Sequence, residues 1–485
     1  MDNGIAPNAK RLLWAGFMAI LAAGVGFSIR AGILGDWGRQ FGFTQTELGQ
    51  ITGGGLLGFG IIILLGALIA DAVGYGKLMI FAFIMHLLSA ILTLAATPVF
   101  NAAGKDAAYW CLYIGMFLFA IGNGIAEAVV NPLVATLFPN NKTHYLNILH
   151  AGWPGGLIVG GLASYFMVGK VKWEIQMVLF MIPVILYGLM CLGQHFPKSE
   201  AKRHGVTFGE MLAEFAQPVL LVLLLIHAMV GYVELGTDSW IGNITGNILA
   251  SPQKGLLLFV YTSGLMFVLR FFAGPIVHKI SPLGLLFVSA ICAFIGLRLL
   301  GAAGTGTLLV VAATVYGLGK TFFWPTMLGV VSERFPKGGA ITIGAIGGIG
   351  MLSAGLLGGP GIGYKQDYFA SNDLKAKAPA VYEEYKSPSK NRFLLFPEIQ
   401  GLDGTKVAAV RAKPADQRDE KETQVHNADL HGGRTALKVT AFVPAAMAVL
   451  YLLLILYFKS KGGYKQVHIE GAGAQAKEVP DKATV

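Results

Sequence analysis

Residues 12–34 read LLWAGFMAILAAGVGFSIRAGIL and contain one ionisable side chain, Arg30. A hydrocarbon core about 30 Å thick is crossed by roughly 20 helical residues. A helix also satisfies its own backbone amides, which find no water inside lipid. The stretch is too long for the apolar region of a signal peptide, which spans about 7–15 residues. We therefore expect an uncleaved membrane-spanning helix near the start of the chain.

Stretches of the same kind recur along the chain of 485 residues, of which only 13% are charged. Soluble domains carry about 25% charged residues. The 65 glycines agree with a membrane protein, because small residues let helices pack closely in lipid. The pattern predicts an all-α membrane protein with twelve transmembrane helices, at residues 12–34, 48–70, 77–97, 109–136, 146–168, 173–193, 218–240, 255–277, 283–301, 305–331, 339–363 and 436–458.

The twelve predicted helices form two groups of six. We expect an N-terminal six-helix bundle over residues 1–193 and a C-terminal six-helix bundle over residues 218–458. Residues 194–217 between them are charged, which predicts a cytoplasmic linker with a short amphipathic helix. Residues 459–485 are expected to form a cytoplasmic tail.

Lysine and arginine in short loops indicate the orientation of the helices. The loops on the side of the N-terminus contain thirteen of these residues, and the opposite loops contain five: Arg39, Lys105, Lys170, Lys172 and Lys254. We therefore expect an integral, multi-pass protein of the cytoplasmic (inner) membrane, surrounded by the lipid bilayer, with both termini cytoplasmic.

A long segment of mixed charge, residues 365–435, separates the last two predicted helices and should be extracytoplasmic. Residues 375–388 look polar and flexible. Residues 391–413, NRFLLFPEIQGLDGTKVAAVRAK, contain enough aromatic and alternating apolar residues for a small folded piece. A tolerated loop insertion and a lid or partner-binding module both remain open.

Several functional classes are disfavoured by the sequence. The net charge is +10, but the basic residues lie in short loops and not on one soluble face, so no nucleic-acid partner is expected. The three cysteines (Cys111, Cys191 and Cys292) are far apart, without CxxC or Cys/His spacing, so no metal and no cofactor are expected. Without a Walker motif, an HExxH motif or a nucleophile beside paired acids, we expect neither an enzyme nor an ATP-driven pump.

The two halves of the chain contain corresponding residue patterns. The fourth predicted helix contains Gly122-Asn-Gly124, Asn131-Pro132 and Phe138-Pro139. The tenth contains Gly317-Leu-Gly319, Trp324-Pro325 and Phe335-Pro336. Duplicated transporter folds show such correspondence and bind their substrate between the repeats.

Two stretches resemble a known family. Residues 66–77, GALIADAVGYGK, resemble the G-x-x-x-D-R-x-G-R-K signature of the major facilitator superfamily, with Ala72 and Tyr75 where basic residues are usual. Residues 122–156, GNGIAEAVVNPLVATLFPNNKTHYLNILHAGWPGG, resemble the fucose-permease-like sugar transporters of that superfamily. The resemblance implies two pseudo-symmetric bundles that rock about a central cavity, often with proton symport. An acidic residue is usual in those sugar transporters near the position of Arg30 and Ala31.

Ionisable groups inside a membrane are costly, so each one is a candidate functional residue. Within predicted helices one, four, seven and ten, which line the cavity in the resembled fold, they are Arg30, Glu127, His227, Glu234, Asp238 and Lys320. The supporting helices contribute only His86 and, near a helix end, Arg298. This distribution predicts a polar central site.

Glu127 is the residue that we expect to carry proton coupling or to bind substrate hydroxyls. Burial disfavours its charged form and nearby cations favour it, so such a carboxyl group can load and release a proton near neutral pH. Asn123 and Asn131 lie four residues to either side, which predicts a shared helix face suited to polyols. The alternative is a structural ion pair of Glu127 with Arg30 or Lys320.

Further substrate or coupling candidates have alternatives of their own. The fork of Arg30 suits a carboxylate or a diol, or else its side chain reaches the outer surface. Lys320 and Trp324 would offer a cation beside an aromatic face, or only helix packing. Glu234 is a substrate residue or part of a solvated gate at the mouth of helix seven. Asn147 and His150 complete the candidate site, although His150 is also typical of an interior histidine.

A second set of candidates is expected to close the cytoplasmic gate. It comprises Asp71, Lys77, Arg270, Glu333 and Arg334, of which Arg270 could instead face the cavity.

The sequence therefore predicts a secondary active transporter of a small polar organic solute, a sugar or sugar acid by resemblance, coupled to a proton. Two alternatives stay open: an organic-anion transporter unrelated to sugars, and a non-transporting membrane sensor on the same scaffold.

Overall fold

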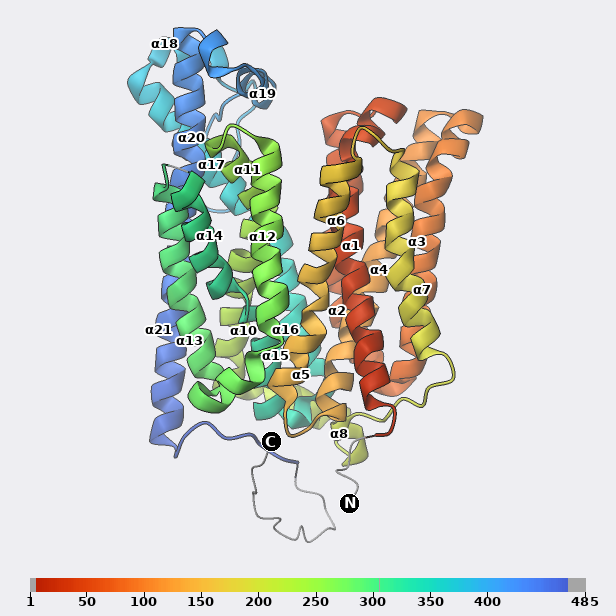
Figure 1. The fold of residues 1–485 in the computed structure, drawn as a ribbon. Coiled ribbons are helices and arrows are strands. Elements are labelled where there is room, and N and C mark those ends of the chain that lie inside the picture. Colours follow the sequence, from red (N-terminus) through yellow and green to blue (C-terminus); the bar gives the residue numbers. More distant parts are fainter. Residues whose placement is uncertain (1–5, 305, 470–485) are drawn as a thin grey trace.

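A computed structural model describes residues 6–304 and 306–469, without the side chains of residues 45, 46, 53 and 54. Two helical bundles stand side by side (Figure 1). The N-terminal bundle contains α1 (Ala9–Phe41), α2 (Gln45–Val73), α3 (Tyr75–Ala103), α4 (Lys105–Leu137), α5 (Lys142–His150), α6 (Gly152–Met167) and α7 (Trp173–Cys191). Because α5 and α6 are separated only by Ala151, they form one crossing, and the bundle has six.

The C-terminal bundle also has six crossings, several of them irregular. The seventh is α10 (Pro218–Gly231), the π-helical turn η2 (Tyr232–Gly236) and α11 (Thr237–Ile248); the eighth is α12 (Pro252–Arg270); the ninth lies in α13 (Ala273–Ala302); the tenth is α14 (Gly306–Lys320) and α15 (Phe323–Arg334); the eleventh is α16 (Gly339–Ser353), η4 (Ala354–Gly358) and α17 (Gly359–Lys377); the twelfth is α20 (Glu420–Thr440) and α21 (Phe442–Ser460). Eleven helices of the described chain are long and apolar enough to span a membrane, and the split α5–α6 pair is the twelfth crossing. The predicted twelve-helix, two-bundle fold is confirmed.

Residues 271–281 differ from the prediction, in which helix eight continues to residue 277. The eighth crossing stops at Arg270, and a new helical segment begins at Ala273. Its backbone turns sharply at Ser281, which has a φ of 65°, and continues from Pro282 as the ninth crossing. The predicted helix 255–277 is therefore broken near its end, and the break leaves Arg270 at the last turn of α12.

The linker between the bundles folds against the face at which α1 begins and α21 ends, here called the terminal face (Figure 1). It contains α8 (Glu200–Arg203) and α9 (Phe208–Ala213), whose N-caps are Ser199 and Thr207. An apolar cluster joins the linker to α16 and to the C-terminal tail, through Ala201, Met211, Ile341 and Ile469.

Residues 365–435 form a folded unit at the opposite end of the C-terminal bundle (Figure 1). It contains the outer part of α17, α18 (Pro379–Tyr385), α19 (Gly404–Ala412), η5 (Ala415–Gln417) and the start of α20. Its own apolar core comprises Leu374, Val381, Tyr382, Val407, Val410, Val425 and Ala428. The expectation that residues 375–388 are flexible was wrong, because apolar residues in and beside that polar stretch are buried against α19 and α20.

Close helix contacts in the N-terminal bundle depend on glycine. A β-carbon on Gly156 of α6 would lie 2.4 Å from the carbonyl oxygen of Leu21 and 2.5 Å from the amide nitrogen of Val25. Both atoms belong to the backbone of α1, so only a shift of one helix could accommodate the added group.

We predict that Gly156→Ala lowers the free energy of unfolding by about 1–3 kcal/mol, the usual cost of overpacking. Thermal unfolding of the purified protein in detergent measures this change. Gly209→Ala in the exposed α9, where an added β-carbon meets no atom within 4 Å, is the control and should not destabilise the protein. Equal midpoints for Gly156→Ala and the unsubstituted protein would contradict the close packing of α1 and α6.

Candidate functional site

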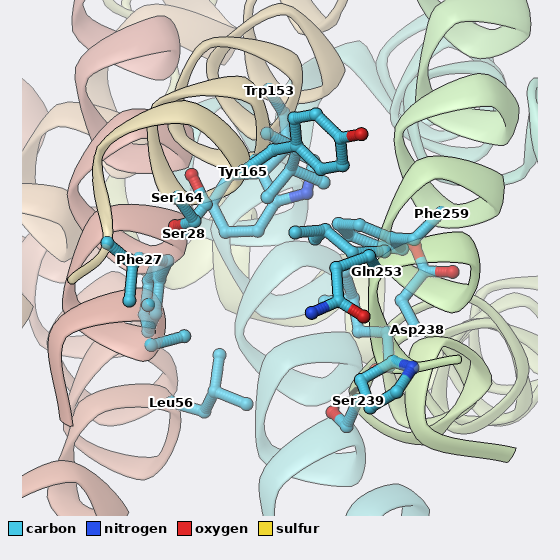
Figure 2. A pocket seen from close by; sticks show the side chains of 18 residues that line it. Phe27, Ser28, Leu56, Trp153, Ser164, Tyr165, Asp238, Ser239, Gln253 and Phe259 are labelled. Atoms are coloured by element: carbon cyan, nitrogen blue, oxygen red, sulfur yellow. Dashed lines mark hydrogen bonds between the residues drawn. The ribbon is translucent and has the colours of Figure 1, made fainter. Parts of the chain in front are cut away.

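A cavity of about 620 Å³ lies between the two bundles. It reaches the end opposite the terminal face, since its walls include Val168, just after α6, and Pro252, the first residue of α12. Figure 2 shows Phe27, Ser28, Ser164 and Tyr165 from the N-terminal bundle facing Asp238, Ser239, Gln253 and Phe259 from the C-terminal bundle. A space of this size, with apolar walls and a few polar groups, is typical of a small-molecule site.

A smaller cavity of about 30 Å³ shares Trp153 and Leu235 with the large one. Its other lining residues are Ile20, Ala23, Phe59, Glu127, His150, Glu234, Arg270, Trp324 and Met351. Four predicted substrate candidates therefore meet here: Glu127, His150, Glu234 and Trp324. The indole nitrogen of Trp153 is buried without a hydrogen-bond partner. An unused hydrogen-bond donor therefore lies at the boundary between the two cavities.

Arg270 connects four helical crossings at this point. Its Nη1 donates to the carbonyl of His150 (2.6 Å), its Nε to the carbonyl of Thr321 (2.8 Å), and its Nη2 to Oε1 of Glu234 (3.0 Å). Both carbonyls lie four residues before a proline, Pro154 and Pro325. Because proline has no amide hydrogen, neither carbonyl receives the usual helical hydrogen bond, and the guanidinium takes that place.

The irregular helices of both bundles thus converge on one side chain. The α5–α6 interruption supplies the carbonyl of His150, the α14–α15 interruption supplies that of Thr321, and the π-helical turn η2 presents Glu234. Broken helices inside a membrane are tolerated where the freed backbone groups find partners or line a cavity. Arg270 was predicted either to join the gate or to face the cavity, and it lines the small cavity.

Glu127 is held in a network within and between the bundles. Its Oε1 accepts from Nδ2 of Asn131 (3.1 Å) and from the indole of Trp324 (3.4 Å), and it lies 3.5 Å from Nε2 of His150. Nε2 of His150 is also 2.8 Å from Oδ1 of Asn131. The alternative pairing of Glu127 with Arg30 or Lys320 is not found here.

Two acids of the C-terminal bundle, Glu234 and Asp238, are paired with bases. Glu234 is only 2% exposed and pairs with Arg270 at 3.0 Å, so it is not a solvated rim residue. Its second oxygen, Oε2, is buried without a partner. Lys320 pairs with Asp238, which reaches the wall of the large cavity.

Two candidates of the N-terminal bundle lie away from both cavities. The guanidinium of Arg30 packs over Phe119 (4.1 Å) and Phe180 (4.9 Å) and donates to Oγ of Ser89 at 2.8 Å. Oδ1 of Asn123 accepts from Nε2 of His86 at 2.9 Å, whereas Asn131 contacts Glu127. Asn123 and Asn131 do not form the predicted shared face, because the side chain of Asn123 points toward α3 and contacts His86 there.

The bundles are joined at the terminal face by polar contacts around Glu333. Its Oε1 accepts from the hydroxyl of Thr143 (2.6 Å), and its Oε2 from the hydroxyl of Tyr464 in the tail (2.7 Å). Arg334 donates to the carbonyl of Lys465 and lies over the ring of Phe458. Burial and the neighbouring Glu333 raise the pKa of Tyr464 well above its usual value, so it stays a hydroxyl donor.

Lys142 adds a second link at this face. Its ammonium pairs with Glu200 of the linker (2.7 Å) and donates to the carbonyl of Ser332 (3.1 Å). Asn147 donates to Oγ1 of Thr326 (3.2 Å), so it joins α5 to α15 and does not line either cavity. Lys77 is exposed, and the backbone carbonyl of Asp71 accepts from Lys202. The contacts of Glu333 and Lys142 close the terminal face, and the large cavity reaches the opposite end of the protein.

Several lining residues were not predicted from the sequence, because their side chains are not ionisable. Ser28, Ser164 and Gln253 are uncharged, and nothing in their local pattern separates them from ordinary helix residues. Trp153 had a usable signal, because it follows His150 by three residues and therefore lies on the same side of the helix.

Comparisons with known proteins agree with this architecture. A model of the Major Facilitator Superfamily matches residues 16–359. The protein TsgA homolog of Buchnera aphidicola subsp. Schizaphis graminum is 22% identical over 277 residues, which are 55% of this chain and 68% of that protein.

Two solved structures are similar in fold. FucP, a fucose:proton symporter of E. coli, superposes in its outward conformation with a TM-score of 0.64, 14% identity, and coverage of 91% of this chain and 98% of that chain. The proton:xylose symporter XylE, bound to 6-bromo-6-deoxy-D-glucose, gives a TM-score of 0.65 and 14% identity, with coverage of 93% and 95%.

We predict that Arg270→Met destabilises the protein by about 3–5 kcal/mol, because Glu234 is left as a buried charge without its partner. The double variant Arg270→Met/Glu234→Met should recover much of this loss. Thermal unfolding measures both, with Arg298→Met, an exposed arginine of α13, as the control. A double variant no more stable than Arg270→Met would argue against the buried pair.

We also predict that Glu333→Gln opens the terminal face more often, because it weakens contacts to both Thr143 and Tyr464. A cysteine at Thr136, which lines a small cavity at that face beside Lys142 and Ser332, should react faster with a maleimide after Cys111 and Cys292 are replaced by serine. Lys337→Gln changes an exposed neighbour and serves as the control. An unchanged labelling rate in Glu333→Gln would remove Glu333 from the gate.

Proposed function

Because the chain belongs to the Major Facilitator Superfamily, a family of membrane transporters, we propose that it is a secondary active transporter of a small polar organic solute, a sugar or sugar acid, that works by alternating access. The observation that carries the proposal is the central cavity, which is open at one end and sealed at the other by contacts between the bundles. Rocking of the bundles would exchange these two ends. The fucose and xylose symporters of similar fold support a sugar as the solute.

The charges around the cavity favour an uncharged solute. Among the described lining residues, Arg270 is paired with Glu234, and Lys320, which lies behind the wall, is paired with Asp238. Neither cation is free to bind an anion without leaving a buried carboxylate unpaired, which is costly. Hydroxyl, amide and indole groups (Ser28, Ser164, Gln253 and Trp153) match sugar hydroxyls. An organic anion is the second candidate, because a displaced Arg270 would offer a rigid fork.

We further propose that Glu127 couples transport to a proton. Its carboxyl group is buried beside His150, Asn131 and Trp324, so a proton and a substrate hydroxyl would compete for the same oxygens. The excess of basic residues in the loops of the terminal face supports a cytoplasmic location for that face. The cavity of this structure would then open to the outside, where the segment 365–435 also lies.

The identity of the solute is tested by thermal shift in detergent, with L-fucose, D-xylose and D-glucose against D-glucuronate and unrelated organic anions. A ligand at a hundred times its dissociation constant stabilises the folded state by about 2.7 kcal/mol. We expect the neutral sugars to raise the unfolding temperature. A shift with D-glucuronate alone would restrict the proposal to a sugar acid, and a shift with the unrelated anions alone would replace it by the organic-anion candidate.

For coupling, we predict that Glu127→Gln abolishes uptake driven by a pH gradient and leaves solute exchange, because an amide cannot carry the proton. Uptake and exchange are compared in proteoliposomes. Glu174→Gln, a carboxylate of α7 that accepts from Thr97 at 2.6 Å outside both cavities, is the control. Undiminished pH-driven uptake in Glu127→Gln would refute the coupling role.

A further inference from the structure

A third cavity, of about 380 Å³, lies between the C-terminal bundle and the folded segment 365–435. Its walls come from α11 (Trp240 and Asn243), from α17, from residues 391–402 and from α19 and α20. The helix α11 separates it from the central cavity, because Asp238 and Ser239 line the central one and Trp240 and Asn243 line this one. It therefore lies beside the open mouth of the transport path.

The walls of this cavity are fixed by specific contacts. The hydroxyl of Tyr364 donates to the carbonyl of Pro397 (2.7 Å), and the indole of Trp240 donates to the carbonyl of Gly359 (2.7 Å). Antiparallel pairings join Lys386 to Leu402 and Asn391 to Ile399, so residues 386–402 form a closed loop over the site. The cavity is a built space and not a gap left by an unattached loop.

The lining has aromatic faces and uncharged hydrogen-bonding groups. Tyr364 and Phe393 pack with their ring centroids 6.0 Å apart, and Trp240 contributes a third ring. The electron-rich face of such a ring attracts the weakly positive C–H groups of a sugar. Asn243 and Asn391 offer amide donors and acceptors, and the amide nitrogen of Gln366 is buried without a partner.

The formal charges of the cavity wall balance, because two arginines (Arg392 and Arg411) accompany two carboxylates (Asp367 and Asp429). Arg411 is held by two hydrogen bonds to Asp429, at 2.7 and 2.6 Å, so its guanidinium is already neutralised by a carboxylate. The negative charge of Asp367 balances the positive charge of Arg392 in the same wall. The wall therefore offers an anion no net positive charge, whereas a polyol can donate its hydroxyls to the two carboxylates.

We propose that this cavity is a second binding site, for a neutral monosaccharide or a similar polyol, at the mouth of the transport path. The ligand class that we infer for this cavity rests on the proposed function. The location and the lining of the cavity are independent of the central cavity. The site would hold solute beside the mouth before the solute reaches Trp153.

The test is protection of a cysteine at Gly404, which lines the cavity and where an added β-carbon meets no atom within 4 Å. The full-length protein, with Cys111 and Cys292 replaced by serine, is labelled with a maleimide in the presence of L-fucose, D-xylose, D-glucose or D-glucuronate. At ten times its dissociation constant, a bound sugar should slow labelling of Gly404→Cys by about tenfold, because only the free fraction reacts. Leu395→Cys, 94% exposed on the same loop, is the control and should react at an unchanged rate.

Two further variants assign the protection to this cavity. Phe393→Ala should abolish the protection of Gly404→Cys, and Asn243→Ala, on α11 outside the inserted segment, should weaken it even if Phe393→Ala disturbs the loop. Glu127→Gln should leave the protection unchanged. The inference is overturned if no sugar protects Gly404→Cys, if Leu395→Cys is protected equally, or if protection survives both Phe393→Ala and Asn243→Ala.

The outcomes separate this inference from the proposed function. Sugar uptake without protection of Gly404→Cys would overturn the second site and leave the transporter proposal intact. Protection without uptake of any tested sugar would support the second site and count against sugar transport.

Discussion

The arrangement of the central site depends on one arginine that completes the hydrogen bonding of broken helices. Pro154 and Pro325 leave the carbonyls of His150 and Thr321 without their helical donors, and Arg270 donates to both. An unsatisfied carbonyl inside lipid would cost several kcal/mol. The charge that replaces the missing donors is in turn balanced by Glu234. One side chain thereby fixes three crossings of the C-terminal bundle and reaches across to the N-terminal bundle.

The pairing of Arg270 with Glu234 determines which charged groups of the central site lack an oppositely charged partner. Because Arg270 is committed to Glu234, and Lys320 to Asp238, the C-terminal half contributes paired charges to the centre of the molecule. The N-terminal half contributes Glu127, whose partners are Asn131, His150 and Trp324 and not a permanent cation. Glu127 is thus the acid of the central site that a proton can neutralise without breaking an ion pair with lysine or arginine.

The two ends of the molecule also differ from each other. Contacts around Glu333, Lys142 and the tail close the terminal face, whereas the opposite end holds a large open cavity and the folded segment 365–435. That segment has its own apolar core, and α11 separates its cavity from the central cavity. An insertion of this kind can add a binding surface without disturbing helices that are already packed.

The sequence by itself determined the twelve crossings and the two bundles, because long apolar stretches have only one stable arrangement in lipid. It also named Glu127, His150 and Trp324 as candidates for the centre, and Glu234 as a candidate for either the centre or the mouth, since a buried ionisable or polar group needs a reason to be there. Only the tertiary structure decided the partners. It placed Arg30 beside Phe119 and Phe180 and away from Glu127. It decided that Arg270 faces the centre and not the gate, and that Lys320 pairs with Asp238. Pairing between helices depends on their rotation and on where each one breaks, and these are set by contacts between residues far apart in the chain, which no local pattern contains.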